Sequence, residues 1–167
     1  MVKRDELISF RSYAGDYGFH KGFYNDNDPE KTLCHIRFSE YFTMPDDDNF
    51  VYDDAHPLLR GSCHLFALSL SKVLGYCSYI IEGKVGGFHS FCQVYKNHQH
   101  FYIDARGVTT SFDEFMDVAG DFVNDEFIVR KITPQDIEEW ENNEDYYEEA
   151  LAFAEAVIRD YEECYRV

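Results

Sequence analysis

The hydrophobic pattern of the chain is most continuous between residues 62 and 74. Apolar side chains there cover most faces of a helix, and such a helix is buried at the centre of its domain. Gly75 predicts where the helix ends, because glycine readily adopts the left-handed conformation that follows a helix C-terminus. The apolar positions of this segment are Leu65, Phe66, Leu68, Leu70, Val73 and Leu74.

Short apolar runs bounded by turn-forming residues follow this helix and predict β-strands. After the third run, Ser111 is followed three residues later by Glu114, which is the capping-box pattern of a helix start. A further strand is predicted after that short helix. The predicted strands cover residues 77–81, 89–95, 101–105 and 127–132.

The end of the chain predicts helices with an acidic outer face. Residues 133–136 (Thr-Pro-Gln-Asp) combine an N-cap residue with proline at the first helical position. After a break near Asn143, apolar and aromatic side chains recur every three or four positions, which predicts an amphipathic C-terminal helix. Its apolar positions are Tyr147, Leu151, Ala154, Ile158, Tyr161 and Tyr165.

Together these elements predict an α+β fold in which an antiparallel sheet packs against a central buried helix. With 167 residues, 45% of them hydrophobic, the chain suits a single domain spanning residues 1–167. Residues 1–60 form its irregular N-terminal part, with one helix from Asp28 to Tyr41. Residues 61–132 form the helix-plus-sheet core, and residues 133–167 the C-terminal acidic helices.

Two of the predicted strands form a hairpin whose register follows from their side-chain pattern. Asn97-His98 is the expected two-residue turn, since asparagine tolerates the left-handed conformation that such a turn requires. If Lys96 pairs with Gln99, one face is apolar, and a one-residue slip would mix the two faces. The apolar face carries Cys92, Val94, Phe101, Ile103 and Ala105, and the other face carries His89, Phe91, Gln93, Tyr102, Asp104 and Arg106.

This register predicts a catalytic triad of Cys63, His89 and Asp104. Asp104 lies diagonal to His89, at roughly 7 Å between backbones, so its carboxylate can orient the imidazole. Cys63 begins the buried helix, where free N–H groups and the helix dipole favour a thiolate. A nearby imidazole lowers the thiol pKa further and shuttles the proton. The Cys63 N–H is the expected first oxyanion donor.

A cysteine at a helix start, followed by a histidine strand and an aspartate strand, resembles the papain-like superfamily of cysteine hydrolases in its broad sense. The layout is closest to the transglutaminase-like branch. Residues 60–63 (Arg-Gly-Ser-Cys) are also loosely similar to the stretch before the nucleophile of arylamine acetyltransferases. The resemblance covers residues 58–115. It implies thiol-based acyl chemistry on a protein or peptide substrate, as a protease, deamidase or acyltransferase, without a cofactor.

The chain departs from these families at positions around the nucleophile. Pro57 occupies the neighbourhood in which papain-type enzymes keep a glutamine oxyanion donor, and Ser90 stands where transglutaminases often have tryptophan. The second oxyanion donor is therefore open, with Asn49, Tyr52 and His64 as candidates. The acidic loop of residues 46–57 is expected to border the substrate cleft.

The net charge of −17 changes the range of expected partners. It repels nucleic-acid phosphates and anionic membranes and permits a basic partner or substrate. The alternative function is therefore a non-catalytic acidic binding or inhibitor protein that engages a basic partner or mimics nucleic acid. Such a protein would keep its function in Cys63→Ala. Its surface would carry Glu138, Glu139, Glu141, Glu144, Asp145, Glu148 and Glu149, although a solvated helix face is the preferred explanation of these residues.

The five cysteines are odd in number and widely scattered. With no N-terminal apolar run typical of a signal peptide and no segment of membrane-spanning length, they predict a reducing, cytoplasmic environment. Metal binding is a further hypothesis, but the closely paired spacing of a zinc site is missing. Its candidate ligands are Cys34 with His35, Cys63 with His64, His89 with Cys92, and residues 53–56 (Asp-Asp-Ala-His).

Overall fold

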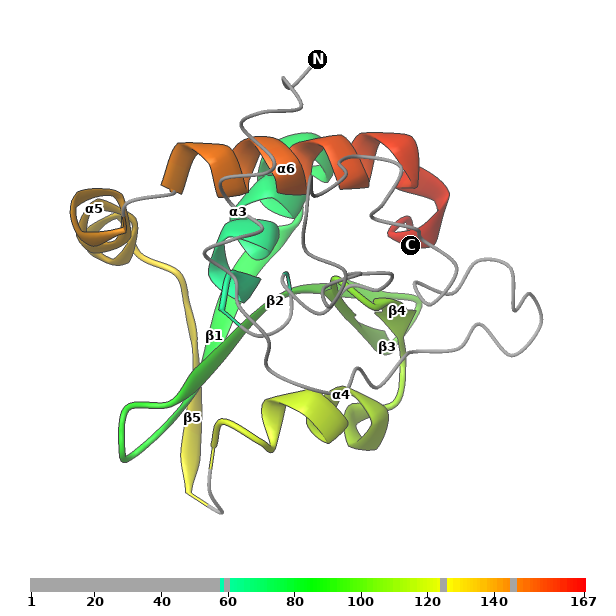
Figure 1. The fold of residues 1–167 in the computed structure, drawn as a ribbon. Coiled ribbons are helices and arrows are strands. Elements are labelled where there is room, and N and C mark those ends of the chain that lie inside the picture. Colours follow the sequence, from blue (N-terminus) through cyan, green and yellow to red (C-terminus); the bar gives the residue numbers. More distant parts are fainter. Residues whose placement is uncertain (1–57, 59–60, 124–125, 145–146) are drawn as a thin grey trace, which may run out of the picture.

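The computed structural model describes residues 58, 61–123, 126–144 and 147–167 (Figure 1). Several predicted features lie outside these residues: the N-terminal helix, the acidic loop of residues 46–57, and the candidate residues Cys34, Asn49 and Tyr52. Within the described residues, no helix combines the length and the apolar character needed to cross a membrane.

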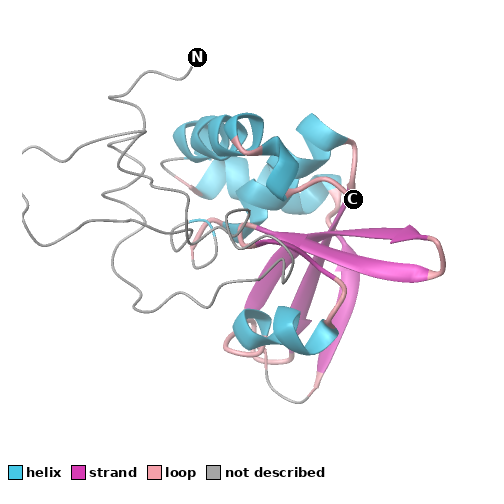
Figure 2. Cartoon of the chain, turned by 90° about the vertical axis from the view of Figure 1, so that its right-hand side faces the viewer, coloured by secondary structure: helices cyan, strands magenta, loops and turns pink. Residues whose placement is uncertain are grey.

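A five-stranded antiparallel sheet lies between two layers of helices (Figures 1 and 2). Helices α3 and α6 cover one face of the sheet and α4 covers the other, while α5 lies at the side. This arrangement confirms the predicted α+β class and the packing of the sheet against a buried helix. The strand order is β4-β3-β2-β1-β5. The strands are β1 (Cys77–Gly83), β2 (Phe88–Lys96), β3 (Gln99–Asp104), β4 (Gly107–Thr109) and β5 (Phe127–Lys131); the helices are α3 (Cys63–Leu74), α4 (Phe112–Ala119), α5 (Pro134–Asn143), α6 (Tyr147–Asp160) and the 3-10 turn η4 (Glu162–Cys164).

Helix α3 is the predicted central helix. Gly75 ends it with φ of 76°, in the left-handed region, and its N–H donates to the Ser71 carbonyl at 2.9 Å. Leu65, Phe66 and Leu70 of this helix are fully buried because α3 lies between α6 and the sheet. The continuous apolar pattern therefore reflects contacts on more than one side of the helix.

The hairpin between β2 and β3 has the predicted register. Lys96 pairs with Gln99, and Asn97 and His98 form the turn with φ of 53° and 63°. Both turn residues are left-handed, as a tight hairpin turn requires, although neither is glycine. Because the register is the expected one, His89 and Asp104 share the face of the sheet that α4 covers.

The sheet has an apolar core on each of its faces. Cys92 and Ile103 face α3 and α6 and belong to the larger core, in which Phe153 of α6 is fully buried. The smaller core lies against α4 and consists of Ile81, Phe91, Phe115, Ala119 and Val123. Two separate cores explain why both faces of β2 are buried through its first half.

The C-terminal helix is shorter than predicted. Helix α6 ends at Asp160, and Tyr165 lies beyond it, after η4. Tyr165 is nonetheless fully buried, and its hydroxyl donates to the Ala105 carbonyl at 3.3 Å. The three-to-four spacing therefore identified four buried residues, Tyr147, Ala154, Ile158 and Tyr165, of which the last reaches the core from a turn, whereas Leu151 and Tyr161 are only half-buried. The fully buried Ala150, Phe153 and Val157 were not among the predicted positions. Tertiary packing outweighs helical periodicity at this end of the chain.

The segment between Asp104 and α4 also differs from the prediction. The short strand β4 had no recognisable pattern, and the third predicted strand ends at Asp104. Ser111 caps α4 by accepting from the Glu114 N–H at 3.2 Å, but the Glu114 carboxylate accepts from the Thr109 hydroxyl at 2.6 Å. Only one of the two hydrogen bonds of the predicted capping box is therefore present, because the Glu114 side chain instead connects α4 to β4.

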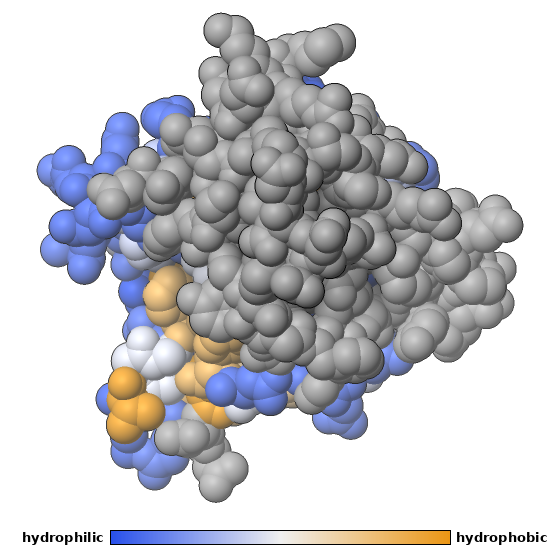
Figure 3. Space-filling view, in the orientation of Figure 1, coloured by the Kyte–Doolittle hydropathy of each residue, from blue (hydrophilic) through white to orange (hydrophobic). Residues whose placement is uncertain are grey.

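Apolar side chains gather on the surface at one edge of the sheet (Figure 3). They belong to the turn between β1 and β2, where Val85 is 78% exposed, and to β5, one of the two edge strands, where Ile128 is 58% exposed. A pocket of about 560 Å³ lies here. It is lined by Glu82, Gly83, Lys84, Glu126, Phe127 and Ile128, and so by none of the predicted triad residues.

Candidate active site

Cys63 is the first residue of α3 and is only 6% exposed. The Ser62 side chain at the N-cap position makes no capping hydrogen bond to the helix. The first N–H groups of a helix have no acceptor within the helix itself. Cys63 therefore lies at the positive end of α3, where the Ser62 side chain does not accept from the free N–H groups of the helix. This environment favours the thiolate.

His89 and Asp104 contact each other across β2 and β3, as the hairpin register predicts. His89 Nε2 lies 3.0 Å from Asp104 Oδ2, and both side chains are buried. Burial would raise the pKa of Asp104, but the Arg106 charge and the hydrogen bond from His89 hold it well below its usual range. The ionised carboxylate only accepts hydrogen bonds, so the proton of the neutral imidazole is placed on Nε2.

The other ring nitrogen of His89 is the one left to act on Cys63. Nδ1 is buried and makes no hydrogen bond of ordinary geometry to the described residues. The imidazole ring is fixed between aromatic side chains, with Phe122 stacked at 6.1 Å and 9° and Phe115 tilted at 5.8 Å and 44°. Such a ring cannot easily turn to exchange its two nitrogens, so its orientation is set before any substrate binds.

Cys63 and His89 shift each other toward the charged forms. Burial opposes a thiolate, but interactions with His64 and then with His89 lower the Cys63 pKa from 9.0 to about 6. Burial likewise opposes an imidazolium, but Asp104 and then Cys63 raise the His89 pKa from 6.5 to about 9. Between these values the side chains form a thiolate–imidazolium pair, which is the reactive state of a cysteine nucleophile.

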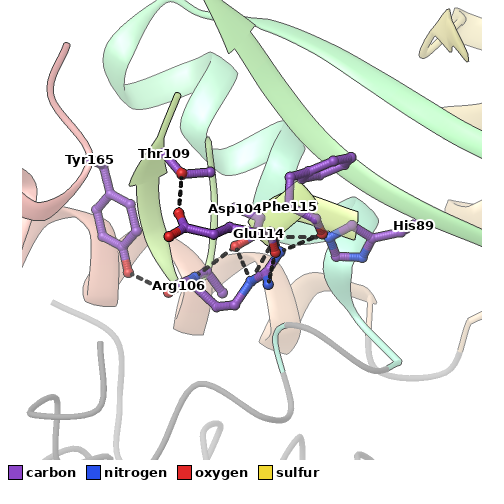
Figure 4. A network of polar contacts seen from close by, with 8 residues as sticks. His89, Asp104, Arg106, Thr109, Glu114, Phe115 and Tyr165 are labelled. Carbon is purple, nitrogen blue, oxygen red and sulfur yellow. Dashed lines mark hydrogen bonds and ion pairs between the residues drawn. The ribbon is translucent and has the colours of Figure 1, made fainter. Parts of the chain in front are cut away.

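Arg106 is the largest fully buried side chain of the described residues, and it lies against Asp104 (Figure 4). Its Nη2 donates to Asp104 Oδ2 at 2.7 Å, and its Nε donates to Oδ1 at 3.1 Å. The backbone N–H of Arg106 also donates to Oδ1, at 2.9 Å. The carboxylate that orients His89 is therefore itself fixed by a charged fork on the same turn.

The guanidinium also reaches the opposite helix. Arg106 Nη1 donates to the Glu114 carbonyl at 3.1 Å, and Nη2 donates to the Phe115 carbonyl at 3.0 Å. These bonds satisfy a cation that is 1% exposed, which would otherwise be costly to bury. Arg106 thus connects the His89–Asp104 pair to α4 (Figure 4).

His64 is a second histidine beside Cys63. Its side chain is 4% exposed, and Nε2 lies 2.7 Å from Oε1 of Glu144, the residue that ends α5. The alignment is that of an ion pair and not of a linear hydrogen bond. Burial lowers the pKa of His64, but Cys63 and Glu144 outweigh it and raise the value to about 9.

The structure brings the predicted Cys63, His89 and Asp104 together, while three further residues around them were not predicted. Arg106 had been placed on the correct face without a role, and its position two residues after Asp104 is the signal that could have suggested the contact. His64 had been named only as a candidate oxyanion donor. Glu144 is 80 residues further along the chain, and no local pattern indicates its contact with His64.

Gly87 provides a test of how tightly His89 is enclosed. A methyl group at this position would lie 2.1 Å from the carbonyl oxygen of Phe122, whose ring stacks on His89. Gly87→Ala is therefore expected to lower the free energy of unfolding by about 1–3 kcal/mol and to slow the alkylation of Cys63, because Phe122 must move. Urea denaturation and iodoacetamide kinetics measure the two effects.

Gly86→Ala is the matched control for this substitution. Gly86 has φ of 90°, and an added methyl group would meet nothing within 4 Å. Its replacement is expected to cost about 1 kcal/mol through backbone strain and to leave the reactivity of Cys63 unchanged. Equal kinetics in the Gly86 and Gly87 variants would show that Phe122 does not control the His89 ring.

Among the described residues, no group of three or more histidine, cysteine, aspartate or glutamate side chains is arranged to hold a metal ion. Cys92, one proposed ligand, faces away from His89, and its thiol donates to the Ala67 carbonyl at 3.3 Å. Burial raises the pKa of Cys92, so this thiol is a packed core group. The other proposed ligands, Cys34, His35 and residues 53–56, lie outside the described residues.

Comparison with protein-family models, curated proteins and solved structures finds no match to this chain. The similarity to papain-like and transglutaminase-like enzymes therefore remains a prediction from the layout of the chain's own residues.

Proposed function

We propose that this chain is an enzyme of thiol-dependent acyl chemistry that acts on a peptide or amide substrate, as a cysteine protease, deamidase or acyltransferase. One observation carries the proposal. Nε2 of the buried His89 ring is held by Asp104, and Nδ1 has no other partner among the described residues, so it is the nitrogen available to interact with Cys63. A histidine used only for packing would need neither an ionised aspartate beside it nor a neighbouring cysteine whose pKa is lowered.

The proposed reaction passes through a thioester. The Cys63 thiolate attacks the substrate carbonyl carbon, a C–S bond forms, and the carbonyl oxygen becomes an oxyanion near the start of α3. The oxyanion collapses, the C–N bond breaks, and the proton of the His89 imidazolium goes to the leaving amine. Water or an acceptor amine then attacks the thioester, His89 takes its proton, and the C–S bond breaks to restore the thiolate.

Asp104 and Arg106 have different supporting roles in this reaction. Asp104 stabilises the imidazolium and keeps the ring oriented, as the third member of such a triad does. Arg106 keeps Asp104 ionised in a buried site, where a lone carboxylate would tend to take up a proton. Asp104 therefore remains a carboxylate while His89 gains and loses its proton.

The order of elements supports the transglutaminase-like comparison at the level of layout. The nucleophile begins α3, and β1, β2 with the histidine and β3 with the aspartate follow in chain order. The proposal includes a basic protein or peptide substrate and a cytoplasmic location. The acidic charge of the chain is the observation that favours a basic substrate.

The proposed function predicts catalytic turnover of an activated ester at Cys63. With p-nitrophenyl acetate, the wild type is expected to release a burst of nitrophenolate, form an acetyl thioester at Cys63, and then turn over continuously. Absorbance follows the kinetics, and peptide mass spectrometry locates the acetyl group. Cys63→Ala is expected to lose the burst, while Cys77→Ala, which removes an exposed thiol, is expected to behave as the wild type.

The same experiment tests the alternative of a non-catalytic acidic protein. Acetylation of Cys63 no faster than that of Cys77, or an acetyl group that stays on Cys63 without turnover, would contradict the enzyme. The exposed acidic residues Glu138, Glu139, Glu141 and Glu148 would then be the surface to probe with basic partners. Glu144 does not belong to that exposed set, because it contacts His64.

A further inference from the structure

The His64 side chain is buried beside Cys63 and is held by contacts from two other elements. It follows Cys63 in the first turn of α3 and is 3% exposed. Its ring packs against Trp140 of α5 at 4.6 Å and Phe88 of β2 at 5.9 Å. Phe88 and Trp140 also stack on each other, so three rings from three different elements meet beside the nucleophile.

One ring nitrogen of His64 has no hydrogen-bond partner among the described residues. Nε2 contacts Glu144, but Nδ1 is buried and makes no hydrogen bond of ordinary geometry to the described residues. A buried polar nitrogen without a partner is costly unless the site uses it. A histidine kept only for packing could be replaced by an apolar ring at this position, and it would need no carboxylate.

We infer that His64 and Glu144 form a second imidazole–carboxylate pair that acts on Cys63 together with the His89–Asp104 pair. Glu144 keeps His64 cationic, and this cation stabilises the thiolate before attack and offsets the negative charge that develops during attack and thioester breakdown. His64 is thus a positioning residue for the nucleophile, and this role rests on the acyl chemistry proposed for Cys63.

The two histidines have different tasks in the reaction. His89 gives its proton to the leaving amine and later takes one from water or an acceptor amine. His64 keeps its proton throughout, because the Glu144 carboxylate lies 2.7 Å from its ring. When His89 has become neutral, one positive charge therefore remains beside the sulfur, and the thiolate remains a good leaving group in the second step.

Charged and titratable groups from several elements face this pair. Cys63 of α3 and Glu144 at the end of α5 act directly on His64, and His89 of β2 acts on it through Cys63. Tyr147 of α6 lies near Glu144, and its pKa is raised by burial and by the acidic side chains around it. Those acidic side chains are Glu141, Glu148 and Glu144.

Helix α5 supplies Trp140, and Glu144 is its C-cap residue, so the second pair exists only while α5 is docked. The docking is anchored at the other end of α5, where Arg130 of β5 contacts Asp136 at 2.7 Å. Asp136 also closes the capping box with Thr133. The helix that carries no fully buried side chain is thereby held at its two ends by charged contacts.

The test compares the pH dependence of Cys63 alkylation by iodoacetamide in the wild type, His64→Gln, Glu144→Gln and His89→Ala. In the wild type the midpoint is expected near pH 6. His64→Gln is expected to raise the midpoint by about one unit or more, and Glu144→Gln to raise it by a smaller amount. His64→Gln combined with His89→Ala is expected to bring the midpoint to that of a free thiol, about 8.5 or above.

His100→Gln is the matched control, since His100 is an exposed histidine on β3. Its midpoint is expected to equal that of the wild type. A midpoint in His64→Gln that also equals the wild type, while His89→Ala moves, overturns the second pair and leaves the proposed function standing. If His64→Gln fails to fold by circular dichroism, Glu144→Gln decides: an upward shift supports the pair, and an unchanged midpoint overturns it.

Failure of the proposed function gives a different result. If the wild type forms no acetyl thioester at Cys63 and shows no turnover, the acyl chemistry is wrong, whatever the midpoints of the variants. If turnover is present and falls in His64→Gln with the ester KM unchanged, the second pair acts at the nucleophile and not on substrate binding.

Discussion

Replacing His89 by alanine is expected to reduce the steady-state turnover of an activated ester by about 100-fold or more, which is the usual contribution of a general acid–base group. The same change is expected to raise the midpoint of Cys63 alkylation from near pH 6 by about one to two units. Both effects arise because His89 holds the thiolate and also activates the nucleophile that resolves the thioester. Ester kinetics and alkylation from pH 4 to 9 measure them.

His100→Ala is the control for this substitution, since it removes an exposed imidazole from β3. Its turnover and alkylation midpoint are expected to match the wild type. Because burial of the His89 ring between Phe115 and Phe122 makes His89→Ala a cavity-forming change, folding is checked by circular dichroism. A folded His89→Ala protein with unchanged turnover would remove His89 from the mechanism.

Replacing Arg106 by alanine is expected to lower the free energy of unfolding by about 3–5 kcal/mol, the usual cost of breaking a buried ion pair from one side. The change leaves Asp104 buried without its main cation and removes one donor each from the Glu114 and Phe115 carbonyls. The pKa of Asp104 is then expected to rise, and the orientation of His89 to weaken. Urea denaturation at pH 7 measures the stability.

Arg159→Ala provides the matched comparison. The Arg159 side chain is 60% exposed, and its contact with Glu155, one helical turn earlier, is 3.8 Å long. Exposed pairs of this kind contribute about 0.5 kcal/mol or less. Arg106→Lys keeps the charge but not the fork, so its stability is expected to lie between those of the wild type and Arg106→Ala. An Arg106→Ala protein as stable as Arg159→Ala would contradict the importance assigned to the buried fork.

The part of the site that follows from local pattern was predicted from the sequence. Side chains alternate between the faces of a strand, so the apolar positions of the hairpin and the Asn97-His98 turn determine the register. That register places His89 and Asp104 together. The helix that begins with Cys63 was likewise visible from its apolar faces and from Gly75 at its end.

The remaining part depends on contacts that no local pattern encodes. Glu144 reaches His64 only because α5 docks beside α3 through Trp140. The three-residue strand β4 is too short to show an alternating pattern. Helix α6 ends before its apolar spacing does, since the final turn directs Tyr165 back to the Ala105 carbonyl. In each case the contact partner is distant in sequence.

Arg106 has a consequence for how the molecule opens. A helix of eight residues such as α4 is unstable in isolation, so its order depends on what holds it against the sheet. The guanidinium that fixes Asp104 also binds two carbonyl groups of α4, and local opening of this helix would leave a buried cation partly unsatisfied. We therefore expect the helix and the His89–Asp104 pair to belong to one cooperative folding unit, so that the backbone amides of α4 exchange with solvent through the same large opening as those of β2 and β3.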